Sequence, residues 1–179
     1  MGISKINVSI KGLTPLLMHA YPMVPIEALD KKPKEEQAEH AAYRDPDTKE
    51  LYIPGINIQR AMINGATYSK GKGRSTLQKP VAACVFVFPE RVSLGTKKFS
   101  IDSRPVVIKA TGGRVLRHRP RLDTWECSFE IEFDNDLLKE SEMRTILDNT
   151  LLRVGLLDFR PEKKGSFGRA MVTEWKAQK

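Results

Sequence analysis

The chain has few of the residues that build disulfide frameworks or metal centres. Among 179 residues there are two cysteines and three histidines, and neither CxxC nor HExxH occurs. Cys84 and Cys127 lie in apolar, strand-like segments, which predicts buried free thiols rather than a disulfide or a metal site. No run of 18 apolar residues is present, which excludes an apolar membrane-spanning helix. We therefore predict a cytoplasmic protein with no metal, no cofactor and no membrane attachment.

Acidic residues are also in short supply. The chain has 22 Asp and Glu against 30 Lys and Arg, which gives a formal net charge of +8 at pH 7. A basic excess favours a polyanionic partner, of which nucleic acid is the commonest. Signals for catalysis are weak, since GxSxG and paired carboxylates are lacking. Asp30, Asp45 and Asp47 fall in a loop, where aspartates are typical turn residues.

Hydrophobic periodicity predicts six main elements. Residues 5–11 and 125–133 alternate as strands, 81–88 is a continuous apolar run typical of a central strand, and 166–175 is a closing strand. Pro54-Gly55 opens a helix of about three turns, and a second helix runs from 135 or 136 until Gly155 ends it. The order βαββαβ predicts an α+β, ferredoxin-like (RRM-like) core with an antiparallel four-stranded sheet and two helices on one face. We expect a single domain over 1–179.

Two segments stand outside this core. Residues 22–50 have the composition of a long loop, with a short helix possible over 38–45. PVVIKA (105–110) is a further short strand, which we place in a side hairpin, within a basic, thumb-like insertion of approximately 92–124. An alternative order, in which this strand joins the main sheet, stays open.

The insertion holds the first candidate for nucleic-acid binding. Its segment 104–122 contains no Asp or Glu, and each cation could neutralise one phosphate. The alternative is a solvated charged hairpin. The basic residues concerned are Arg104, Lys109, Arg114, Arg117, His118, Arg119 and Arg121.

A second candidate is the loop 69–79, where Lys70, Lys72 and Arg74 alternate with glycines. Such a loop can become ordered on nucleic acid, although a flexible linker explains the pattern equally well. The third candidate is the start of the first helix, where free N–H groups attract anions and Asn57 and Arg60 add donors.

The fourth candidate is the stretch KKGSFGR, which comes just before the closing strand. Its glycines could let backbone amides approach a phosphate, and its aromatic ring could stack on a base. A tight turn with the ring in the core is the alternative. The candidate residues are Lys163, Lys164, Gly165, Phe167, Gly168 and Arg169.

Two of these stretches resemble one family. YRDPDTKELYIPGINIQRAMINGA is similar to the segment of the RAMP superfamily of CRISPR-associated proteins in which a DP…IPG pattern leads into the first helix. PEKKGSFGRAMV is similar to the end of the glycine-rich loop of that superfamily. The likeness is greatest to the backbone subunits that coat the guide RNA in class 1 effector complexes.

The resemblance implies a ferredoxin-like RNA-binding subunit without catalytic residues. Its partners would be single-stranded RNA, copies of itself arranged head to tail, and other effector-complex subunits. Where RNA-cleaving members carry an aspartate, this chain has Glu39 and His40. Two alternatives remain: a RAMP-type endonuclease that uses His40 or His19 with a lysine, and a virus or mobile-element homologue that acts as an interaction module or inhibitor.

Overall fold

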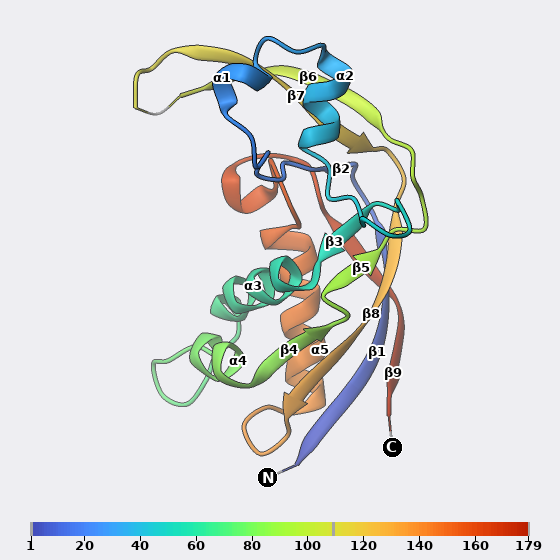
Figure 1. Ribbon diagram of the computed structural model, residues 1–179. Helices are drawn as coiled ribbons and strands as arrows, with labels where there is room; N and C mark the ends of the chain where they lie inside the picture. Colours follow the sequence, from blue (N-terminus) through green and yellow to red (C-terminus); the bar gives the residue numbers. More distant parts are fainter. Residues whose placement is uncertain (1, 109, 179) are drawn as a thin grey trace.

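A four-stranded antiparallel sheet forms the centre of the protein (Figure 1). The computed structural model describes residues 2–108 and 110–178. Strand β1 (Ile3–Gly12) pairs with β8 (Glu126–Asp134) on one side and β9 (Ala170–Ala177) on the other, and β4 (Val85–Phe88) pairs with the outer side of β8. The alternation of β1 buries Ile6, Val8 and Ile10, because successive side chains of a strand point to opposite faces.

Helices cover one face of this sheet (Figure 1). They are α3 (Gly55–Gly65), which a 3₁₀ turn (Ala66–Tyr68) extends, α4 (Gln78–Cys84), and α5 (Glu140–Asn149), which continues as a π-helical turn (Thr150–Val154). Ile58 and Met62 of α3 and Ile146 and Leu147 of α5 are fully buried in the shared core. The predicted α+β class with an antiparallel sheet is thus confirmed.

A second layer lies at one end of the sheet. Strands β6 (Ser100–Val107) and β7 (Arg114–Leu122) form a hairpin, and the short β2 (Leu16–Leu17) adds a third strand to it. Helix α2 (Lys34–His40) packs against β7, and α1 (Ile26–Leu29) precedes it in the chain. Strands β3 (Tyr52–Pro54) and β5 (Arg91–Ser93) form a small ribbon. The placement of 105–107 in a side hairpin, rather than in the main sheet, is confirmed.

Several expected boundaries were wrong. The apolar run 81–88 is not a central strand: residues 81–84 end helix α4, and only 85–88 form β4, an edge strand with Phe86 and Phe88 exposed. An Ala-Ala-Cys sequence is compatible with a helix, and here Val81 and Cys84 are buried at helical spacing. The helix at 38–45 lies earlier, as α2, and the long loop 22–50 contains α1 as well.

The second long helix begins later than its polar residues suggested. Asp134 accepts a hydrogen bond from the backbone N–H of Asp136 and so forms a turn before α5. The helix is then capped at Lys139, whose N–H bonds the side chain of Glu142. Asn and Asp favour turns as readily as helix starts, because their side chains bond nearby backbone groups.

Cys84 and Cys127 are buried and unpaired, as expected. Burial raises the pKa of the Cys127 thiol to about 12. Within the described ranges, no helix has both the length and the apolar character needed to cross a membrane.

Candidate nucleic-acid interface

A polar cleft of about 300 Å³ is lined by residues of the helix-start motif and of the segment just before KKGSFGR. Helix α3 contributes one wall, the segment after the π-helical turn contributes the other, and residues near β2 and β3 close the ends. The cleft therefore brings the start of α3 beside the loop that leads into KKGSFGR. Its lining residues are His19, Tyr43, Asn57, Arg60, Ala61, Asn64, Gly155, Leu157, Asp158 and Arg160.

Helix α3 can begin at this place because Gly55 has no side chain. A Cβ there would lie 2.7 Å from the carbonyl oxygen of Pro89. The helical repeat then places Asn57, Arg60 and Asn64 on one side of α3. Asn64 donates to Glu162 with a distance of 2.7 Å between Nδ2 and Oε1, which ties the helix to the far wall. Arg60 is exposed at the rim, so its guanidinium is available to an anion.

Asp158 supplies the negative charge of the cleft and is held by two partners. Its carboxylate pairs with Arg119 and lies 3.5 Å from Nδ1 of His19. Burial alone would raise the pKa of Asp158, but the hydrogen bond from His19, the charge of Arg119 and the N–H of Phe159 outweigh it and lower the pKa to about 2. Asp158 therefore stays ionised and fixes the position of the His19 ring.

This shift predicts a pH-dependent stability. A carboxyl whose pKa is lower in the folded protein stabilises it above the unfolded-state pKa, and this contribution disappears as the pH falls through the folded-state pKa. We expect Asp158 to contribute about 2 kcal/mol at pH 7, lost between about pH 5 and pH 2. Urea denaturation of the wild type and Asp158→Asn should give unfolding free energies that converge over this range. A difference that stays constant would contradict the assignment.

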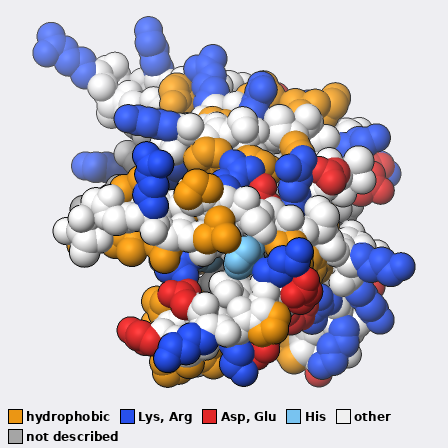
Figure 2. Space-filling view, turned by 90° about the horizontal axis from the view of Figure 1, so that it is seen from above, with side chains coloured by type: hydrophobic (Ala, Val, Ile, Leu, Met, Phe, Trp, Pro, Cys, Tyr) orange, Lys and Arg blue, Asp and Glu red, His pale blue; other side chains and the backbone are white. Residues whose placement is uncertain are grey.

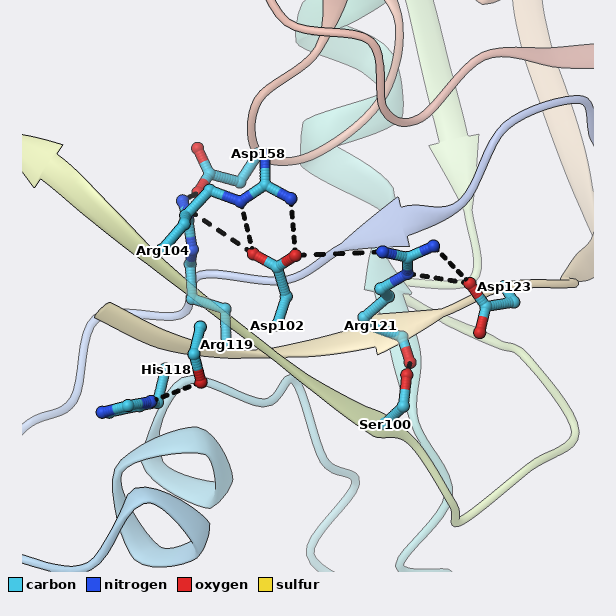
Figure 3. A network of polar contacts seen from close by, with 9 residues as sticks. Ser100, Asp102, Arg104, His118, Arg119, Arg121, Asp123 and Asp158 are labelled. Carbon is cyan, nitrogen blue, oxygen red and sulfur yellow. Dashed lines mark hydrogen bonds and ion pairs between the residues drawn. The ribbon is translucent and has the colours of Figure 1, made fainter. Parts of the chain in front are cut away.

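The base of the hairpin contains an ionic network (Figure 3). Asp102, which is 7% exposed, binds Arg104 through both carboxylate oxygens and lies within 4.0 Å of Arg119 and Arg121. Arg121 also binds Asp123. Asp102 and Asp123 flank the segment 104–122, which itself contains no acidic residue. Arginines of this segment therefore form ion pairs with carboxylates that lie just beyond its two ends.

The network changes what the hairpin cations can do. Arg119 is 4% exposed and bonded to Asp158, so it cannot present its guanidinium to RNA in this structure. Arg117 pairs with Asp30 at 2.9 Å, and His118 bonds Ser103. The expectation of one phosphate for each cation is therefore wrong for Arg119. Arg114 is exposed near the hairpin tip, whereas Lys109 lies outside the described residues.

The KKGSFGR loop is not a cradle of free amides. The N–H groups of residues 163, 164, 165, 167 and 168 donate to carbonyl oxygens of the protein, and that of Arg169 donates to Thr14 Oγ1. Gly165 and Gly168 allow close packing of this chain on itself: a Cβ would lie 1.8 Å from the Phe159 oxygen and 2.0 Å from the Leu156 oxygen, respectively. The glycines thus serve the fold, and the cradle expectation is wrong.

Of the two roles considered for Phe167, stacking on a base and packing in the core, the structure shows the packed one. Its ring is 6% exposed, lies 5.9 Å from that of Phe159, and is covered by the guanidinium groups of Arg104 and Arg121. What this loop does offer to solvent are the exposed side chains of Lys163 and Lys164, with half-buried Arg169 bonded to the Leu152 carbonyl.

The basic loop 69–79 is more ordered than its glycines suggested. Gly71 N–H donates to the Ser75 carbonyl, and Ser75 Oγ donates to the Lys72 carbonyl. The loop keeps Lys70, Lys72 and Arg74 exposed.

Seen from the hairpin end, Lys and Arg side chains surround much of the molecule, with fewer acidic side chains between them (Figure 2).

Sequence reasoning missed four polar residues of the cleft: Tyr43, Asn64, Asp158 and Arg160. Asn64 could have been found, since it follows Arg60 by one helical turn. The others come from loops whose paths depend on tertiary packing. The loop aspartates have the expected turn role where Asp45 accepts from the N–H groups of Asp47 and Thr48, which lowers its pKa.

Comparisons with known proteins show the fold. No family model matches the sequence, and no curated protein matches it. Solved structures do match it, among them two at probability 1.00. One is a chain of the Type III-B Cmr-beta complex bound to cognate target RNA, with 12% identity, a TM-score of 0.62, and coverage of 99% of this chain. The other is Cmr6 from Pyrococcus furiosus, with 9% identity, a TM-score of 0.52, and coverage of 96% of this chain and 99% of that one.

The present chain spans 61% of the length of the Cmr-beta chain that it matches. At these low identities the likeness concerns the fold alone. The resemblance to the RAMP superfamily, drawn from two sequence motifs, is nevertheless confirmed at the level of the fold, which this chain shares with a chain of the Type III-B Cmr-beta complex and with Cmr6.

Proposed function

We propose that the protein is a non-catalytic subunit of a CRISPR-type ribonucleoprotein, which binds single-stranded RNA and assembles head to tail along it. The carrying observation is the cleft lined by Arg60 and Arg160, where Asn64 of the first RAMP-like motif donates a hydrogen bond to Glu162 of the second. The fold shared with a Cmr chain bound to RNA supports this proposal. Other effector subunits would then be further partners.

The order of elements supports a ferredoxin-like core. Along the chain, β1, α3, β4, β8, α5 and β9 follow the βαββαβ pattern, and their sheet order is β4-β8-β1-β9. We infer that α4, the ribbon of β3 and β5, and the hairpin are additions to this core. Residues 92–124 would then be the thumb-like insertion.

The open face of the sheet does not suit RNA. Strand β8 presents Glu126, Glu130 and Glu132 on that face, and Lys5 of β1 is engaged by two of them at 2.9 and 3.3 Å. Neighbouring carboxylates repel a phosphate backbone. We therefore assign RNA to the helical side, where Arg60 lines the cleft and is exposed, and where the exposed Lys163 and Lys164 follow the cleft residue Arg160 in the chain.

A salt titration tests the proposal. Fluorescence anisotropy with a labelled single-stranded RNA should show log affinity falling linearly with log salt, with a slope of about −0.7 for each phosphate contacted. We expect several such contacts from the cations around the cleft and in the loop 69–79. An affinity that does not change with salt, or no binding at low salt, would overturn the proposal.

The same samples address the endonuclease alternative, which the proximity of His19 to Asp158 favours. RNA recovered intact on a denaturing gel would support a non-catalytic role. Cleavage that disappears in His19→Ala would instead support the endonuclease.

A co-purification experiment addresses the second alternative, an interaction module. If the tagged chain co-purifies with effector subunits but binds RNA weakly alone, the interaction module is favoured.

A further inference from the structure

An exposed aromatic ring lies at the end of the helix that forms the cleft. Tyr68 is 53% exposed and ends the 3₁₀ turn that extends α3. It follows Arg60 and Asn64 at intervals of four residues, so the three residues succeed one another along the helix and the 3₁₀ turn that extends it. With a rise of about 1.5 Å per residue in the α-helix and about 2.0 Å in the 3₁₀ turn, Tyr68 lies roughly 13 Å beyond Arg60.

A cation holds this ring in place. The guanidinium of Arg153, from the π-helical turn, lies 5.1 Å from the centre of the Tyr68 ring. Such a contact favours one orientation of the ring. Arg153 is itself exposed, so its charge is also available to a phosphate.

Tyr68 connects two basic regions. On one side are Arg60 and Asn64 in the cleft, and on the other the loop 69–79 begins at the next residue, with Lys70 and Lys72 exposed. A strand that crosses from the cleft to this loop must pass over or beside the ring. Cations at both ends of an exposed aromatic platform are the arrangement by which proteins bind single strands without reading sequence.

The other exposed aromatic side chains among the described residues have different settings. Tyr21, 74% exposed, shares a pocket with Arg117 and Arg119, but the charges of these two arginines are paired with Asp30 and Asp158. Phe86 and Phe88, 45% and 46% exposed, lie on the edge strand β4, next to the acidic strand β8. Phe167, within the basic stretch KKGSFGR, is buried beneath Arg104 and Arg121. Tyr68 thus combines exposure with surrounding positive charge.

We propose that Tyr68, held by Arg153, stacks on a base of single-stranded RNA that leads from the cleft to the loop 69–79. This inference rests on the proposed function and adds a base-dependent contact to its phosphate contacts. Stacking is tolerant of sequence, because every base has a flat face.

The test compares Tyr68→Ala and Tyr68→Phe on two probes of equal length and charge: a single-stranded oligouridine and the same backbone with abasic positions. Tyr68→Ala should weaken binding of the oligouridine about tenfold and leave binding of the abasic strand unchanged. Tyr68→Phe keeps the ring and should bind both probes as the wild type does. Phe86→Ala is the matched control and should change neither affinity.

Equal binding of the oligouridine by wild type and Tyr68→Ala would overturn the stacking proposal and leave the proposed function standing. Equal losses on both probes would also overturn it, since they indicate a structural role. A base-dependent loss in Phe86→Ala instead would place the RNA on the open sheet face. If the wild-type protein binds neither probe, the proposed RNA-binding function itself is wrong, and this result is distinct from the failure of stacking alone.

Discussion

Substituting alanine for Gly168 is expected to lower the free energy of unfolding by about 3–4 kcal/mol, because two costs combine. Gly168 has a φ of +72°, a conformation that is strained for residues with a side chain. An added Cβ would also lie 2.0 Å from the backbone oxygen of Leu156, which cannot move like the end of a flexible side chain. The midpoint and slope of urea denaturation measure the loss.

Gly112 is the matched control for this substitution. It has nearly the same φ, +71°, but a Cβ there would meet nothing within 4 Å. Gly112→Ala should therefore cost only the conformational part, about 1–2 kcal/mol. Similar losses in the two variants would show that the close approach to Leu156 has no energetic weight. In that case, our assignment of Gly168 to close backbone packing against Leu156 would be wrong.

Reversing three charges around the cleft is expected to abolish most RNA binding. A variant with Arg60, Lys163 and Lys164 changed to Glu loses three exposed cations and adds three repulsive charges beside the proposed RNA path. We expect affinity at low salt to fall by about 100-fold or more, and the salt slope to become smaller by about 2 units. Anisotropy titrations at several salt concentrations measure both quantities.

The control for this variant changes net charge equally but elsewhere. Lys11 of β1 and Lys97 and Lys98, between β5 and β6, are exposed and belong to neither of the two segments that the test variant changes. Changing them to Glu should reduce affinity far less, since only the overall field of the protein changes. Comparable losses in the two triple variants would mean that net charge, rather than the cleft, governs binding. Thermal unfolding of both variants should remain close to that of the wild type.

Local patterns were sufficient to predict much of the secondary structure. The alternation in 5–11 and 125–133 corresponds to β1 and β8, and the helix that begins after Pro54 corresponds to α3. Each of these signals depends only on the period of apolar residues and on turn-forming residues nearby. The run 81–88 failed because a short apolar run has no period that separates a buried helix end from a strand.

The candidate site likewise contains residues that the sequence predicted and residues that it did not. Asn57 and Arg60 were predicted from the helix start and do line the cleft, and Lys163 and Lys164 are exposed as a binding role requires. Tyr43 and Asp158 could not be assigned, because loops from different parts of the chain bring them there. Arg119 was misjudged because its counter-ion, Asp158, lies 39 residues away.

By itself the sequence determined the basic character of this protein, its alternation of strands and helices, and the positions of its two RAMP-like motifs, since all three are written in composition and local spacing. Only the tertiary structure decided which cations face solvent and which are paired inside. It also turned the glycines of KKGSFGR from a supposed phosphate cradle into a site of close packing. The physical reason is that burial and ion pairing depend on partners outside the local motif: Phe159 and Leu156 for the glycines, and Asp30 and Asp158 for Arg117 and Arg119.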